Sequence, residues 1–139
     1  MWIRPWPPAS LIWSKVNKSR PHKKPKDLEW IKIFNSTFEA RERIKPNQPQ
    51  LVVIGSTRIC LARLPAAQPG EQDSFFAVGD KCSHNGESLS KGKINFLGEI
   101  VCPWHGYRFS LQSGRCAENY PDITSYPVKE NEEGFFIGL

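Results

Sequence analysis

Cys82-Ser83-His84 and, after 17 intervening residues, Cys102-Pro103-Trp104-His105 are the two stretches that say most about this chain. Each pairs one cysteine with one histidine inside a short segment. Thiolate and imidazole both bind metals, and the combination suits zinc or an iron–sulfur cluster. The two stretches therefore predict a metal centre held by Cys82, His84, Cys102 and His105.

The spacing of the ligands favours an iron–sulfur cluster over zinc. Structural zinc sites usually separate paired ligands by two to four residues, whereas a single residue separates Cys82 from His84. Gly86 and Gly106 follow the two histidines, and glycine allows the backbone to turn sharply and expose its amides. Amide donors are what sulfide and thiolate acceptors need. A structural zinc site remains the alternative.

The whole pattern resembles the Rieske [2Fe-2S] ferredoxin family, from about Leu51 to Leu139. Beyond the four ligands, the likeness includes Gly86, Pro103, Gly106, the run 107–111 and Ser113-Gly114. It implies one [2Fe-2S] cluster per chain, with the two cysteines on one iron and the two histidines on the other. It also implies an antiparallel β-domain whose tip is made of two cluster-binding loops, with a third loop at Tyr120-Pro121 covering the cluster.

Two departures from the high-potential branch of that family affect the expected potential. The loops lack the extra cysteine pair that forms a disulfide there, and Tyr107 stands where that branch has a serine. The missing serine hydroxyl removes one hydrogen bond that would stabilise the reduced, more negative cluster. We expect a midpoint potential in the lower part of the range of roughly −150 to +300 mV for Rieske centres.

Several residues are candidates for contact with a redox partner. We expect the electron to leave through His84 and His105, because each ligand imidazole keeps one nitrogen free of metal. Trp104 lies between two ligands and either packs against the cluster or contacts a partner. Pro121 in the third loop is a further candidate contact.

Residues 1–27 differ in character from residues 28–139, which we predict to form the Rieske domain. Residues 1–26 contain seven of the 19 Lys and Arg residues and no Asp or Glu, so the net charge of +5 conceals a basic arm and a slightly acidic domain. The arm is rich in proline and holds Trp2, Trp6 and Trp13. Because large aromatic residues are enriched where surfaces meet, we expect an arm that docks on a partner protein. A disordered tail and an anchor at a membrane surface are the alternatives, and no recognition motif supports nucleic acid.

The remainder of the chain reads as short strands joined by turns that contain glycine and proline. We expect a connection over residues 38–49 and a hairpin turn at Gly55-Ser56. The predicted strands cover residues 29–34, 51–54, 58–64, 75–78, 94–96, 99–101, 107–111, 123–130 and 134–139. This pattern predicts an all-β fold, a small antiparallel sandwich or barrel.

The two remaining cysteines, Cys60 and Cys116, are expected to be free and at least partly buried thiols. A disulfide between them is the alternative, although it would be unusual in a reducing cytoplasm. The chain lacks a 20-residue apolar run and a signal-peptide pattern. We therefore expect a cytoplasmic location, with attachment to the periphery of a membrane complex as the alternative.

No catalytic constellation is visible, because every histidine except His22 is assigned to metal and a nucleophile would lack its base. We expect an electron carrier and not an enzyme. The first hypothesis is a ferredoxin that links a reductase to an acceptor such as an oxygenase. The second is a fixed subunit of a larger electron-transfer complex, held by the N-terminal arm. The third is a structural zinc module without redox activity.

Overall fold

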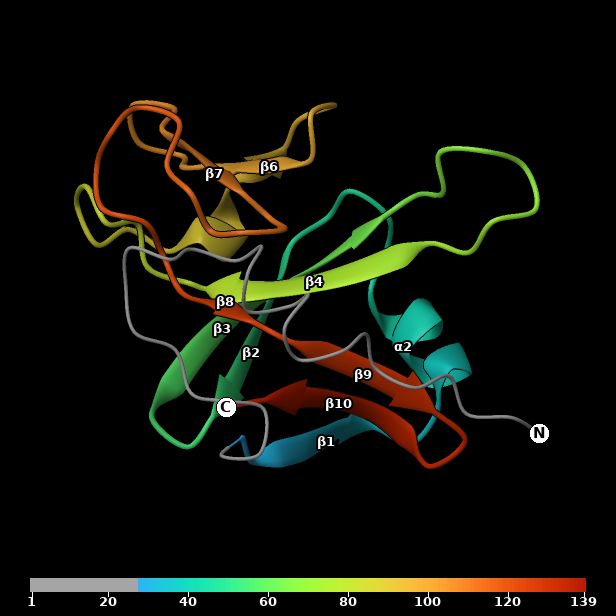
Figure 1. Cartoon of the computed structure of the whole chain (residues 1–139). Helices are drawn as coiled ribbons and strands as arrows, with labels where there is room; N and C mark the ends of the chain where they lie inside the picture. Colours follow the sequence, from blue (N-terminus) through green and yellow to red (C-terminus); the bar gives the residue numbers. More distant parts are fainter. Residues whose placement is uncertain (1–27) are drawn as a thin grey trace.

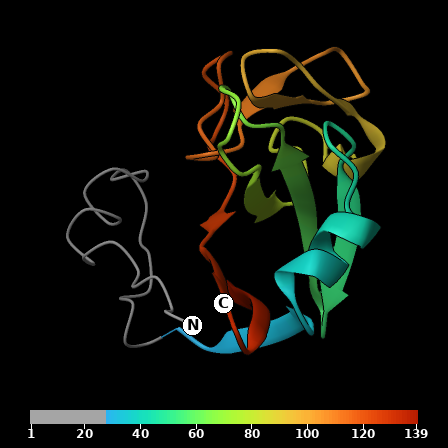
Figure 2. The same ribbon diagram turned by 90° about the vertical axis from the view of Figure 1, so that its right-hand side faces the viewer.

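The computed structural model describes residues 28–139 (Figure 1). The predicted arm, including Trp2, Trp6 and Trp13, lies outside the described residues, so its role and the boundary at residue 27 stay predictions. Figures 1 and 2 show strands β6 and β7 at one end of the molecule and β1, β9 and β10 at the other, with a four-stranded sheet between them. The predicted all-β class with an antiparallel arrangement is confirmed.

The four-stranded sheet has the order β2 (Gln50–Ile54), β3 (Thr57–Leu64), β4 (Ser74–Gly79) and β8 (Ser125–Tyr126). The predicted turn at Gly55-Ser56 joins β2 to β3, where Ile54 pairs with Thr57. The side chains of β3 alternate between two apolar cores, as the period of a strand requires. Cys60 and Ala62 face one core, and Ile59 and Leu61 face the other. The sheet is therefore covered on both faces at its centre.

The sheet at the end opposite β6 and β7 consists of β1 (Trp30–Phe34), β10 (Gly134–Gly138) and β9 (Val128–Asn131), in that order. Strands β9 and β10 form the predicted hairpin. The Asn131 side-chain oxygen accepts from the amides of Glu133 and Gly134 and closes the turn. Phe135 and Ile137 on the central strand are fully buried.

The third sheet carries the strands around the second predicted ligand stretch. It consists of β5 (Lys93–Ile94), β6 (Glu99–Val101) and β7 (Arg108–Ser110), preceded by the short 3-10 helix η2 (Leu89–Lys91). Leu89, Ile100 and Phe109 are fully buried and pack with Cys60 and Ala62 of β3. Both predicted ligand stretches are thus attached to one well-packed core.

The predicted connection over residues 38–49 does join β1 to β2, but its first half forms a helix that was not predicted, α2 (Thr37–Arg43). The Ser36 hydroxyl accepts from the Glu39 amide at 3.0 Å, and the Glu39 carboxylate accepts from the Asn35 amide at 2.8 Å. This reciprocal pair resembles a capping box and satisfies donors at the start of the helix. Ala40 and Ile44 on one side of the segment are buried, so packing stabilises a helix too short to be stable alone.

Two strand predictions also need correction. The predicted strand 123–130 is divided at Pro127, so that β8 pairs with β4 and β9 pairs with β10. Proline has no amide proton to continue a ladder, and here the chain passes from one sheet to the other. The predicted strand 94–96 ends at Ile94, because Asn95 begins a tight turn in which Phe96 is 95% exposed.

No helix within residues 28–139 is long and apolar enough to cross a membrane.

Candidate metal centre

The first ligand loop follows β4 and is closed by its own backbone. The Cys82 amide donates to the Glu87 carbonyl at 2.9 Å, and the Gly86 amide donates to the Cys82 carbonyl at 2.8 Å. Gly86 has a φ of +79°, a left-handed conformation that glycine adopts without strain. The loop therefore folds back on Cys82, whose side chain is buried.

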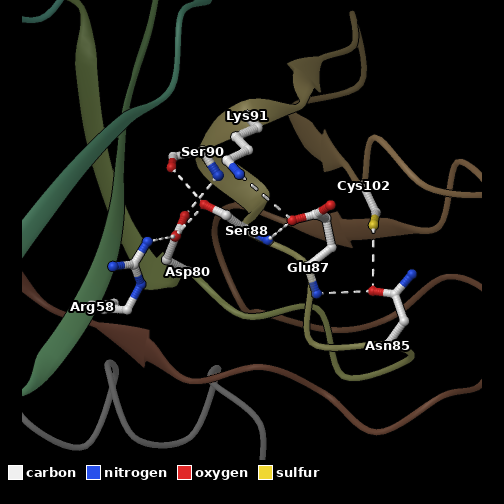
Figure 3. Close-up of polar contacts among 8 residues, drawn as sticks. All are labelled: Arg58, Asp80, Asn85, Glu87, Ser88, Ser90, Lys91 and Cys102. Atoms are coloured by element: carbon white, nitrogen blue, oxygen red, sulfur yellow. Dashed lines mark hydrogen bonds and ion pairs between the residues drawn. The ribbon is translucent and has the colours of Figure 1, made fainter.

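Asp80 fastens this loop at its base, as Figure 3 shows. Its side chain is fully buried and accepts from the Ser88 hydroxyl at 2.5 Å and from the Ser90 amide at 2.6 Å. The exposed Arg58 guanidinium approaches it to 3.5 Å. One carboxylate thus ties the start of the loop to its end and to β3. The sequence reasoning missed this residue, although a carboxylate two positions before a ligand cysteine was visible.

The second ligand loop joins β6 to β7. The Cys102 amide donates to the Tyr107 carbonyl at 2.7 Å. His105 and Gly106 both have left-handed backbones, with φ of +69° and +71°. For a residue other than glycine this conformation costs roughly 1–3 kcal/mol and is often found at functional sites. The turn places the His105 ring on the surface while Cys102 stays buried.

The fold brings the four predicted ligands together and separates them by type. The thiols of Cys82 and Cys102 are both buried and contact each other. The rings of His84 and His105 lie edge to face with centroids 5.4 Å apart, His84 half-buried and His105 exposed. The thiol pair therefore lies inside, and the imidazole pair lies toward the surface.

The surroundings of Cys102 have opposing effects on the pKa of its thiol. Burial raises the pKa of Cys102, the backbone amide of Trp104 works to lower it, and the adjacent Cys82 thiol raises it further. The Trp104 amide is thus a backbone donor to the Cys102 sulfur, the kind of group that a thiolate ligand needs.

The donor set fits a two-iron cluster. The Nδ1 atom of His84 is buried and has no hydrogen-bond partner in the protein, a state that is costly for a polar atom and that binding to a metal would relieve. Cys82, Cys102, His84 and His105 offer two thiolates and two imidazoles, the donor set that a Rieske cluster takes, with the thiolates on one iron and the imidazoles on the other.

Two tyrosines cover His84. The Tyr107 and Tyr120 rings stack with centroids 4.8 Å apart, and their hydroxyls lie 3.3 Å apart. Their ring centroids lie 4.1 Å and 4.9 Å from that of His84. The hydrogen bond with Tyr120 raises the pKa of Tyr107. The Tyr120-Pro121 segment thus lies beside a predicted ligand, as expected for the third loop, whereas the contact of Tyr107 with His84 was not foreseen.

Trp104 is 59% exposed, and its ring contacts His105 edge-on with centroids 6.0 Å apart. Of the two interpretations of Trp104, this exposure favours contact with a partner. Cys60 and Cys116 are free and buried, as predicted.

Comparison with known proteins identifies the family. The Rieske [2Fe-2S] domain family matches residues 36–129. This chain belongs to that family, and its cofactor is accordingly a Rieske-type [2Fe-2S] cluster. No comparison supports the zinc alternative.

Individual relatives agree with this result. Over 67 residues the chain is 34% identical to the 3-phenylpropionate/cinnamic acid dioxygenase ferredoxin subunit of Shigella boydii serotype 4 (strain Sb227), covering 47% of this chain and 63% of that protein. The match therefore spans less than two thirds of the relative's length.

Solved structures show a similar fold. One is a chain of the complex of reduced oxygenase and oxidised ferredoxin in carbazole 1,9a-dioxygenase, with a TM-score of 0.61, 23% identity, and coverage of 77% of this chain and 99% of that chain. Another is a putative small subunit of NADPH nitrite reductase, with a TM-score of 0.62, 19% identity, and coverage of 79% and 98%.

Proposed function

We propose that this chain is a one-electron carrier of the ferredoxin type, in which Cys82 and Cys102 hold one iron and His84 and His105 hold the other. The observation that carries the proposal is the sorting of the four side chains, with buried thiols and an exposed His105. When bound, the cluster takes up and releases one electron. Such a carrier needs no catalytic site of its own.

The two imidazoles have different surroundings, and this gives them different parts in the proposal. His105 is exposed, so a partner protein can approach the centre most closely there. His84 is screened by the rings of Tyr107 and Tyr120. Trp104 beside His105 offers an exposed aromatic anchor of the kind enriched at interfaces. The proposed contact surface therefore consists of His105, Trp104 and the exposed Pro121.

The proposed partners are a reductase as electron donor and an oxygenase as electron acceptor. Support comes from the dioxygenase ferredoxin subunit to which the chain is similar and from the oxygenase and ferredoxin complex that contains a chain of the same fold. We place the carrier in the cytoplasm, since Cys60 and Cys116 are unpaired thiols, which suit a reducing compartment.

Electron transfer to an oxygenase tests this function directly. The full chain replaces the ferredoxin subunit in a reconstituted 3-phenylpropionate dioxygenase, and substrate-dependent NADH consumption and product formation are measured. We expect turnover above the rate without ferredoxin. Cytochrome c serves as a second electron acceptor. The proposal would be refuted if the chain accepted no electrons from the reductase, or if it passed electrons neither to this oxygenase nor to cytochrome c.

Trp104→Ala tests the contact surface, with Phe96→Ala as the matched control. Both side chains are exposed aromatics, but Phe96 lies in the turn before β6 and Trp104 in the loop after it. We expect Trp104→Ala to slow electron transfer to the partner about tenfold, the effect of losing an interface residue worth roughly 1.4 kcal/mol. Phe96→Ala should leave the rate unchanged, and equal effects of the two changes would contradict the assignment.

The predicted docking arm is tested by deleting residues 1–26. A freely diffusing carrier keeps its activity with soluble partners after the deletion. Loss of a co-purifying complex would instead favour the fixed subunit held by Trp2, Trp6 and Trp13.

A further inference from the structure

Two neighbouring polar atoms in the first ligand loop have no hydrogen-bond partner. Within residues 28–139, Ser83 Oγ and His84 Nδ1 are the buried side-chain nitrogen and oxygen atoms in this state. The proposed binding of iron by His84 explains the second atom. It leaves the hydroxyl of Ser83, between Cys82 and His84, without an explanation.

The neighbouring hydroxyl and amide side chains of the loop are already engaged. The Ser88 hydroxyl bonds to Asp80 and lies 3.0 Å from the Ser90 hydroxyl. The Asn85 carbonyl oxygen accepts from the Glu87 amide. A buried hydroxyl without a partner is costly, so Ser83 requires an acceptor that is not one of these groups.

Sulfur in the metal centre is the acceptor that the place of Ser83 in the sequence, between two proposed ligands, makes available. Both sequence neighbours of Ser83 are proposed ligands, and the Cys82 thiol is buried against Cys102. In the bound state these thiols are thiolates, and each accepts hydrogen bonds, as the bridging sulfides do. A hydroxyl donates one proton in any direction that its rotation allows.

We propose that Ser83 donates its hydroxyl hydrogen to a sulfur atom of the cluster, either a bridging sulfide or a ligand thiolate. This inference rests on the proposed cluster ligands. Tyr107 replaces the serine expected on the second loop in high-potential relatives, and its hydroxyl lies 3.3 Å from that of Tyr120. Ser83 supplies a hydroxyl donor from the first loop instead.

A donor to cluster sulfur stabilises the reduced, more negative state and raises the midpoint potential. We expect loss of the Ser83 hydroxyl to lower the equilibrium constant for reduction of the cluster about tenfold, which lowers the midpoint potential by about 59 mV for one electron. Removing a surface hydroxyl elsewhere in the chain should have no such effect.

Two pairs of full-length, cluster-loaded proteins test the proposal, each pair differing in one hydroxyl. The first pair is wild type and Ser83→Ala, and the second is Ser83→Thr and Ser83→Val, which have nearly equal volume. Protein-film voltammetry gives the midpoint potential. Pulsed electron–nuclear double resonance after exchange into D₂O detects deuterons coupled to the reduced cluster. Ser125→Ala serves as the control, because the Ser125 hydroxyl donates to the exposed Gln112 backbone carbonyl, 3.2 Å away.

The proposal predicts that the hydroxyl-bearing member of a pair has the higher midpoint and one additional exchangeable deuteron coupling. The second pair decides the result if Ser83→Ala does not retain the cluster. Equal midpoints, or a shift without loss of a deuteron coupling, would overturn the hydrogen bond while leaving the carrier function intact. Absence of iron and of a paramagnetic signal in the wild-type protein would overturn both.

Discussion

Replacing Asp80 by alanine removes the carboxylate that fastens the first ligand loop (Figure 3). Two short hydrogen bonds are lost, from the Ser88 hydroxyl at 2.5 Å and the Ser90 amide at 2.6 Å. Hydrogen bonds to a charged group contribute roughly 1.5–3 kcal/mol each. The Ser88 hydroxyl keeps its contact with Ser90, and the Arg58 side chain, 55% exposed, becomes hydrated instead. We therefore take the lower end of this range for each of the two bonds, a loss of about 3 kcal/mol in the free energy of unfolding.

A loss of this size should lower the melting temperature of the domain by roughly 10 °C. Because Cys82 and His84 lie in the same loop, the cluster should also be lost faster to a chelator. Circular dichroism melting gives the first quantity, and the decay of visible absorbance in excess EDTA gives the second.

Glu87→Gln is the matched control. Glu87 is a carboxylate of the same loop, but its ion pair with Lys91 is long, at 4.0 Å, and Lys91 is 70% exposed. Such pairs contribute little. The Ser88 backbone amide donates to the Glu87 carboxylate at 2.8 Å, and glutamine keeps a side-chain oxygen that can accept this hydrogen bond. A melting temperature of Asp80→Ala within about 2 °C of wild type, with unchanged cluster decay, would refute the role given to Asp80.

Three further predictions concern single groups. Burial works to raise the pKa of Asp73, but the Arg63 guanidinium at 2.7 Å and the Ala66 amide outweigh it and hold the pKa below its ordinary value. The stabilisation by Asp73 is therefore complete above about pH 4 and lost as pH falls through the lowered pKa, so wild type should lose more stability than Asp73→Asn in acid denaturation; parallel losses would contradict this. Burial, followed by the Asp80 charge, raises the pKa of the Cys60 thiol, so Cys60 should resist thiol reagents at pH 8 until the protein unfolds, as mass spectrometry of the labelled chain would show. Tyr107→Phe removes only the hydroxyl that lies 3.3 Å from that of Tyr120. We expect the midpoint potential to stay within about 15 mV of wild type, a quarter of the roughly 59 mV that corresponds to a tenfold change in the equilibrium constant; a larger fall would show that Tyr107 also donates to the cluster.

The four proposed ligands could be named from the sequence alone, because residue type and spacing limit which metal centre such side chains can hold. Two Cys and two His in short loops restrict the choice of metal by the chemistry of their donor atoms alone. The glycines after each histidine also indicated sharp turns, and both have left-handed backbones in the folded chain.

The features that sequence reasoning missed depend on contacts between distant segments. Helix α2 is short and polar, and Ala40 and Ile44 are buried because they pack against β10 and its neighbours. In the sequence, only the spacing of Ser36 and Glu39 indicates the start of this helix. The stacking of Tyr107 on Tyr120 requires the third loop to return to the second. The engagement of Asp80 with Ser88 and Ser90 is a consequence of loop closure, which residue types alone do not specify.

The most direct test of the central claim is an electron paramagnetic resonance spectrum of the purified full-length chain after dithionite reduction, with iron and zinc quantified on the same sample. We predict a rhombic signal with a low average g value and about two irons per chain. A colourless, silent sample that contains zinc and no iron would contradict the assignment of Cys82, His84, Cys102 and His105 to a Rieske cluster.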